Sequence, residues 1–75
     1  FIVMVIFIKN QIYILDNYSH IYLEDADDDR EINFVCKYTN EISYLVFETK
    51  EDAELVMQQI KDVFQKCNEC FEIKY

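Results

Sequence analysis

Residues 49–67 read TKEDAELVMQQIKDVFQKC, and this stretch decides the fold class because it holds the clearest periodic pattern in the chain. Apolar residues recur at three- and four-residue spacing, which predicts a single buried stripe along an amphipathic helix: Ala53, Val56, Met57, Ile60, Val63, Phe64 and Cys67. Thr49 suits the N-cap position and Asp52 stands three residues later, so the helix should begin at Lys50. Glu51 and Asp52 also suit the positive end of the helix dipole.

The residues before this helix show the patterns of β-strands. Phe1 to Ile8 is an unbroken run of β-branched and aromatic residues, typical of a strand that is covered on both faces or of one strand in a sheet shared with a partner. Further strands are expected at 12–15, 18–24, 31–39 and 42–48, with turns at Asn10–Gln11, Asp16–Asn17 and Asn40–Glu41. The alternating tail at 71–75 could add a short final strand.

Alternation within two of these strands assigns their faces. In 18–24 it separates Ser19, Ile21 and Leu23 from His20, Tyr22 and Glu24, and in 31–39 it groups Ile32, Phe34, Cys36 and Tyr38. Together the patterns predict one small α+β domain over residues 1–75. We expect an antiparallel meander sheet of four to five strands, with the C-terminal helix packed on one face.

One helix cannot cover a whole sheet, so one face should stay open to a partner. That face carries Tyr and aliphatic residues, including part of the run Phe1 to Ile8. Such a strand is too apolar to present an open edge or face to water. We therefore expect a homodimer, or a tight complex with another protein, with this strand at or beside the interface.

Composition and charge narrow the function classes. The 75 residues are 52% apolar and contain neither Gly nor Pro, which excludes glycine-built phosphate loops. Seven basic residues against 15 acidic ones give a net charge of −8, which repels phosphate backbones and attracts basic surfaces. The longest apolar run is too short to span a membrane, and no basic leader precedes it, so we expect a cytoplasmic protein. Met4 could be the natural start.

The most distinctive chemistry is an acidic cluster, Glu24, Asp25, Asp27, Asp28, Asp29 and Glu31, which is offset only by Arg30 and carries −5 of the net charge. The spacing of its aspartates resembles the opening of an EF-hand calcium loop. Arg30 stands where that loop needs glycine, however, and Cys36 stands where a glutamate should close the site. The remaining interpretations are a solvated hairpin tip and a set of carboxylates that imitates nucleic-acid phosphates on a basic partner.

The cysteines and the single histidine give weaker signals. Cys67 and Cys70 form a CxxC pair that Cys36 and His20 could complete as a zinc site, but one CxxC is half of a zinc signature. The positions of Cys36 and Cys67 within apolar patterns favour thiols that act as small hydrophobic groups. A redox dithiol is disfavoured because the pair follows a helix C-terminus, where the dipole raises a thiol pKa.

No catalytic motif is present, since no nucleophile, base and oxyanion hole are placed by any pattern. We therefore expect no enzymatic activity, no cofactor and no bound metal. In size, acidity and lack of catalytic groups the chain resembles the small inhibitors, including anti-CRISPR proteins, that phages and mobile elements use against host nucleases. No motif carries this resemblance. It implies an acidic protein that docks on a basic partner, such as a nuclease or another nucleic-acid-binding protein. The alternative is a structural or oligomerisation module with a solubilising acidic loop.

Overall fold

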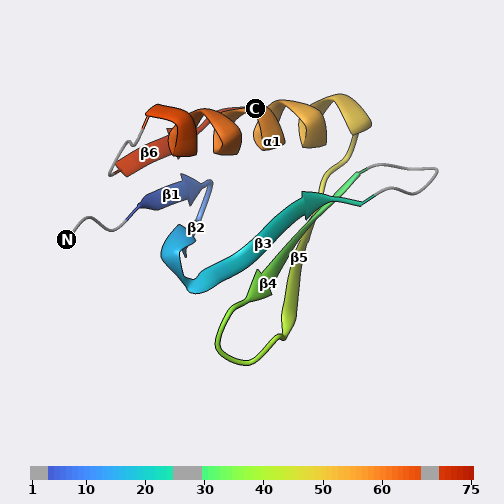
Figure 1. Ribbon diagram of the computed structural model, residues 1–75. Coiled ribbons are helices and arrows are strands. Elements are labelled where there is room, and N and C mark those ends of the chain that lie inside the picture. The colour runs from blue at the N-terminus through green and yellow to red at the C-terminus, as the bar shows by residue number, and fades with distance from the viewer. Residues whose placement is uncertain (1–3, 25–29, 67–69) are drawn as a thin grey trace.

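The computed structural model describes residues 4–24, 30–66 and 70–75, and within these ranges it holds two three-stranded sheets and one α-helix (Figure 1). The first sheet has the order β2-β1-β6 and the second has the order β3-β4-β5. The strands are β1 (Val5–Ile8), β2 (Gln11–Ile14), β3 (Tyr18–Leu23), β4 (Glu31–Cys36), β5 (Ile42–Val46) and β6 (Cys70–Ile73), and the helix is α1 (Lys50–Lys66).

The α+β class is confirmed, but the prediction of a single four- to five-stranded sheet is wrong. Only β3, β4 and β5 form an antiparallel meander. The strand β1 lies in the other sheet, antiparallel to β2 and parallel to β6, so the expected final strand at the C-terminal end exists and pairs with the first. Both edges of β1 are therefore occupied, and only its outer face can meet a partner.

The chain changes sheets at a short 3-10 turn, η1 (Leu15–Asn17), which replaces the bend predicted at Asp16–Asn17. Two hydrogen bonds fix this turn against the start of β1. The Leu15 N–H donates to the Met4 carbonyl at 2.8 Å, and the Met4 N–H donates to the Asp16 carboxylate at 3.0 Å. The buried side chain of Leu15 also anchors η1 in the core.

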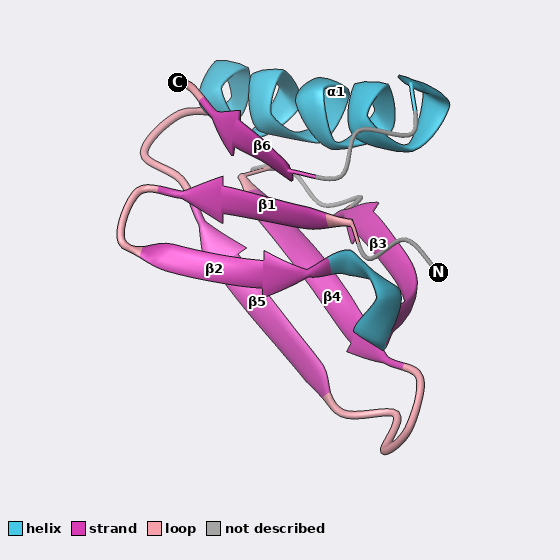
Figure 2. Ribbon diagram, turned by 90° about the vertical axis from the view of Figure 1, so that its left-hand side faces the viewer, coloured by secondary structure: helices cyan, strands magenta, loops and turns pink. Residues whose placement is uncertain are grey.

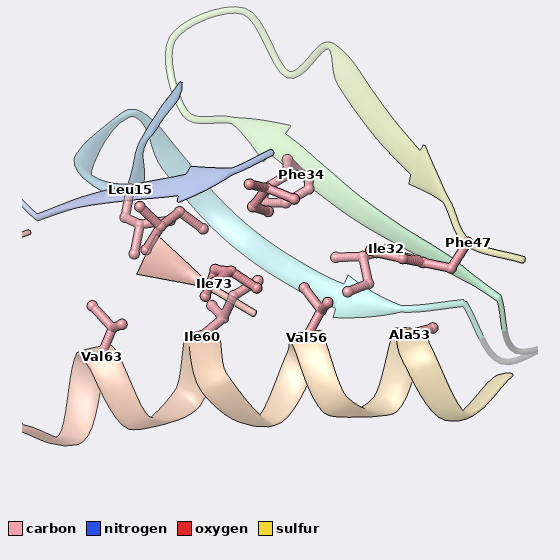
Figure 3. Close-up of a cluster of buried hydrophobic side chains, with 11 residues drawn as sticks. Leu15, Ile32, Phe34, Phe47, Ala53, Val56, Ile60, Val63 and Ile73 are labelled. Atoms are coloured by element: carbon pink, nitrogen blue, oxygen red, sulfur yellow. The ribbon is translucent and has the colours of Figure 1, made fainter. Parts of the chain in front are cut away.

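The hydrophobic core fills the space between the two sheets and the helix (Figure 3). Its buried side chains come from every layer: Ile6, Ile8, Leu15, Ile32, Phe34, Phe47, Ala53, Val56, Ile60, Val63 and Ile73. Tyr13 and Tyr18 both pack on Phe34, with ring centroids 4.7 and 5.3 Å away, and burial raises the pKa of both tyrosines. The core thus joins residues that are far apart in the sequence.

The helix contacts β3 and β4 of one sheet and β6 of the other, so it packs against both sheets and not against a single one (Figure 2). The side chain of Gln59 ties it to the end of β6, since its amide donates to the Lys74 carbonyl at 2.6 Å and accepts from the Lys74 N–H at 2.9 Å. Among the residues described, no helix has both the length and the apolar character of a membrane span.

The start of α1 and most of its buried stripe are confirmed. Thr49 Oγ1 accepts a hydrogen bond from the Asp52 N–H at 3.1 Å, and the helix begins at Lys50. Phe64 is the exception, because it is 43% exposed beside β3, while Cys67 lies outside the described residues.

In the β3-β4-β5 meander, the predicted assignment of residues to the two faces is correct inside the strands and wrong at their ends. Ile32 and Phe34 are buried as expected, but Tyr38 is exposed because β4 ends at Cys36. The pairing of β3 with β4 shifts register between Tyr18 and His20, so Tyr18 contacts the core although Ser19 was predicted on that face.

Two turns place a non-glycine residue in the left-handed region. The turn between β1 and β2 holds Lys9 and Asn10 rather than the predicted Asn10–Gln11 pair, and Lys9 has φ 52°. Asn40, predicted as a turn residue, has φ 62° and donates its N–H to the Cys36 carbonyl at 2.9 Å. Asparagine tolerates this conformation better than lysine does. The Lys9 ammonium also lies 4.6 Å from the Tyr75 ring centroid.

Candidate protein-binding face

The side of the β3-β4-β5 sheet that points away from the core forms an open surface, which we call the outer face. Cross-strand pairing arranges its side chains in three rows of three, because alternate residues of each strand share a face. The rows are His20, Val35 and Ile42; Tyr22, Asn33 and Tyr44; and Glu24, Glu31 and Val46. Two carboxylates therefore occupy one end of this surface, and apolar side chains of β5 run along one edge through all three rows.

Three large apolar side chains of the outer face come from the edge strand β5. Ile42, Tyr44 and Val46 are 55%, 65% and 56% exposed. A single exposed apolar residue is common on protein surfaces, but three alternate residues on the same face of one strand form a continuous patch of the kind that marks interaction sites. The expectation of an open face with Tyr and aliphatic residues is thus met by β5, whereas Val5 and Phe7 of the first run lie on the other sheet.

Asn33 occupies the centre of the outer face between the two tyrosines, yet it is only 4% exposed. Its side-chain amide donates a hydrogen bond of 2.8 Å to Glu24 Oε2. This contact satisfies a buried polar group and holds the Glu24 carboxylate in a fixed position. A partner would therefore meet an oriented carboxylate here, which lowers the entropy lost on binding.

The second carboxylate of the outer face belongs to Glu31, which opens β4. Its carbonyl accepts from the Glu24 N–H at 2.8 Å, so the two glutamates face each other across the β3–β4 pair. Arg30 is fixed beside them, because its carbonyl accepts from the Phe47 N–H at 2.8 Å and its Nη1 donates to the Glu48 carbonyl at 3.2 Å. Glu24 and Glu31, at the two ends of the predicted acidic cluster, are therefore held in place by backbone hydrogen bonds at or beside them.

The structure brings together two of the six residues of the predicted acidic cluster. Glu24 and Glu31 lie side by side on the outer face, while Asp25, Asp27, Asp28 and Asp29 lie outside the described residues. Sequence reasoning missed Asn33 and its bond to Glu24. The available signal was a polar residue between Ile32 and Phe34, in the middle of an otherwise apolar strand.

The thiols and the histidine considered for zinc are spread over three strands. His20 lies on β3, Cys36 ends β4 and Cys70 begins β6 in the other sheet, and Cys67 lies outside the described ranges. Within those ranges, no three His, Cys, Asp or Glu side chains are grouped so that they could hold a metal ion.

Cys36 is the one described thiol with a clear electrostatic environment. A hydrogen bond from the Thr39 side chain, followed by bonds from the backbone N–H groups of Tyr38 and Thr39, lowers the pKa of the thiol below its ordinary value. The cause is the tight turn after β4, which directs these donors at the sulfur. This turn therefore favours the thiolate.

Comparison with protein-family models, with curated proteins and with solved structures found no match for this chain. Its function is therefore inferred from the chemistry of the described residues and the charge of the sequence.

Proposed function

We propose that this protein is a small acidic binding protein, without enzymatic activity, that docks its outer face on a basic partner such as a nuclease or another nucleic-acid-binding protein. The observation that carries this proposal is the exposed apolar edge of β5 on the same face as the carboxylates of Glu24 and Glu31. The Glu24 carboxylate is oriented by Asn33. Stable interfaces combine exposed apolar and aromatic groups with polar and charged ones.

Charge determines the class of partner. The chain has a net charge of −8, to which Glu24, Glu31 and the four aspartates of 25–29 contribute. The field of these charges steers a positively charged surface toward the outer face and repels nucleic acid itself. A protein that normally binds phosphates offers Arg and Lys side chains that can pair with carboxylates instead. In this role the protein acts as an inhibitor that imitates nucleic acid.

The experiment starts with affinity capture from lysate at low salt, followed by mass spectrometry, and continues with the isolated partner. Replacing Glu24 and Glu31 together with Gln should weaken binding about tenfold or more, since charge pairs at interfaces are each worth more than about 1 kcal/mol. The matched control replaces Glu51 and Glu54 of α1 with Gln, which removes the same charge away from the outer face.

Apolar contacts are tested by a second pair of variants. Tyr44→Ala should weaken binding strongly, because exposed aromatic residues become hot spots when a partner covers them. Leu55→Ala is the control, since Leu55 is a similarly exposed apolar residue on the helix. Equal losses in the variants and their controls, or binding that is insensitive to salt, would contradict the proposal.

The alternative, an oligomerisation module, is favoured by a different surface. On the β2-β1-β6 sheet the side opposite the core carries Val5, Phe7, Ile12 and Ile14, which pair across β1 and β2. Ile12 is 67% exposed, and the one charged residue that the described pairing places on this face is Glu72 of β6, next to Phe7. A homodimer built here should be less sensitive to salt than a complex through the acidic outer face.

A further inference from the structure

A groove of about 370 Å³ runs between β3 and α1, beside the outer face, with which it shares His20. One wall consists of the consecutive residues Tyr18–Ile21, and the other includes Met57, Lys61 and Phe64 of the helix. Consecutive strand residues point to opposite faces of a sheet. A wall made of four in succession is therefore the edge of the strand, with its backbone, and not one of its faces.

The edge of β3 offers hydrogen-bonding groups to this groove. β3 is an outer strand of its sheet and pairs only with β4 in the described residues. The Glu24 N–H bonds to the Glu31 carbonyl, so by the alternation of an antiparallel ladder the residues that bond toward β4 are 24, 22 and 20. The N–H and C=O groups of Ile21, in the groove wall, and of Leu23, which continues the same edge beyond the groove lining, therefore point away from β4. Such an edge is a template for an added strand.

The side chains of the groove define what kind of strand would fit. Met57 and the 43% exposed Phe64 give its helical wall an adaptable apolar surface. Lys61 is the basic side chain of the lining, since the His20 ring lies on the outer face with its centroid 4.8 Å from that of Tyr22, and no carboxylate belongs to the lining. In a chain of net charge −8, this lining is locally complementary to an anion.

We propose that this groove binds an extended peptide segment of a partner protein, which adds to the edge of β3 and carries an apolar side chain next to a carboxylate. The peptide backbone pairs with Ile21 and Leu23, the apolar side chain packs on Met57 and Phe64, and the carboxylate lies near the Lys61 ammonium. Addition of a strand to a sheet edge is a general mode of peptide recognition. The register shift between Tyr18 and His20 ends the regular edge, so the paired segment is short.

The test uses two series of acetylated pentapeptides with alternating β-branched residues, one ending in Glu and one ending in Lys. Peptides of the Glu series should slow hydrogen exchange of the Ile21 and Leu23 amides, as followed by NMR. Lys61→Glu should weaken their binding by about tenfold or more, because it turns an attraction into a repulsion. Lys66→Glu is the matched control, since Lys66 is on the same helix and outside the groove lining.

Four outcomes would overturn the proposal. The first is an absence of binding by either series up to about 1 mM peptide, and the second is equal binding of the two series. The third is an equal effect of Lys61→Glu and Lys66→Glu, and the fourth is binding that leaves the Ile21 and Leu23 amides unprotected. Protection that rises with protein concentration when no peptide is present would assign this edge to a second copy of the chain instead. N-methylation of the peptide backbone should abolish binding if strand addition is correct.

Discussion

Truncation of Ile60 to alanine should destabilise the protein more than any surface change on the same helix. Ile60 is 1% exposed and lies in the middle of the buried stripe of α1, between Val56 and Val63. The substitution removes three carbon atoms, which costs about 2.4 kcal/mol at about 0.8 kcal/mol per buried methylene. A cavity that does not collapse adds about 1–2 kcal/mol at about 24 cal/mol per Å³. We therefore expect a loss of about 3–4 kcal/mol.

The measurement is urea unfolding followed by far-UV circular dichroism, with Gln58→Ala as the control. Gln58 is exposed and its amide bonds to Asp62 at 3.2 Å on the helix surface, so its loss should change stability by less than about 0.5 kcal/mol. A domain of this size has about 4–11 kcal/mol in total, so Ile60→Ala could unfold it. Ile60→Val, with an expected loss of about 1 kcal/mol, then keeps the measurement possible. Equal midpoints for the Ile60 and Gln58 variants would refute the assigned buried face.

Four other predictions address single contacts. Gln59→Ala should cost about 0.5–1.5 kcal/mol in urea unfolding, because it removes the exposed hydrogen bonds that join the helix to the N–H and C=O of Lys74; a loss no larger than that of the neighbouring surface glutamine would contradict this. Asn40→Val should cost about 1–2 kcal/mol because φ is 62° there, whereas Asn40→Gly should be tolerated. Thr39→Val should raise the pKa of Cys36, seen as a shift of its alkylation rate to higher pH in a protein whose other cysteines are serine. Since folding lowers this pKa, the thiolate adds stability above the unfolded pKa, and that contribution is lost as the pH falls through the folded pKa. Ile12→Lys should leave the thermal melt nearly unchanged and abolish self-association in light scattering; a wild-type protein that stays monomeric at high concentration would count against the homodimer.

The elements that depend on near neighbours were predictable from the sequence. Thr49 and Asp52 mark the start of α1 because a cap is formed within one turn of the helix. Ile32 and Phe34 are buried as their alternation predicts, because the pleat fixes which residues share a face. The tip between β4 and β5 was likewise indicated by Asn40, which adopts the left-handed conformation that asparagine tolerates.

The division into two sheets was not predictable, because it depends on contacts between distant residues. No local pattern in 1–8 or 70–75 specifies that Ile6 lies beside Phe71 in a parallel pair. A strand pattern states which residues share a face but not which strand lies next to it. The positive φ of Lys9 has no sequence signal either, since lysine is not a residue that favours this conformation.

The sequence predicted the acidic residues of the candidate site but not the contacts that arrange them. Glu24 and Glu31 were identified from the density of carboxylates around them, and their strand positions followed from alternation. The bond from Asn33 to Glu24 depends on the register of β3 against β4, which the sequence does not state. The groove beside β3 was missed for the same reason, because it exists only where the helix meets the strand edge.

The parallel pairing of β1 with β6 determines how the domain responds to tension. A force that pulls the chain before Val5 away from the chain after Ile73 acts along the axes of two adjacent parallel strands, because these two points lie at opposite ends of the pair. The hydrogen bonds between β1 and β6 then bear the load together, in shear, instead of opening one after another as in a hairpin pulled from its open end. The first and last strands therefore form a mechanical clamp that protects the helix and the meander from extension until it breaks.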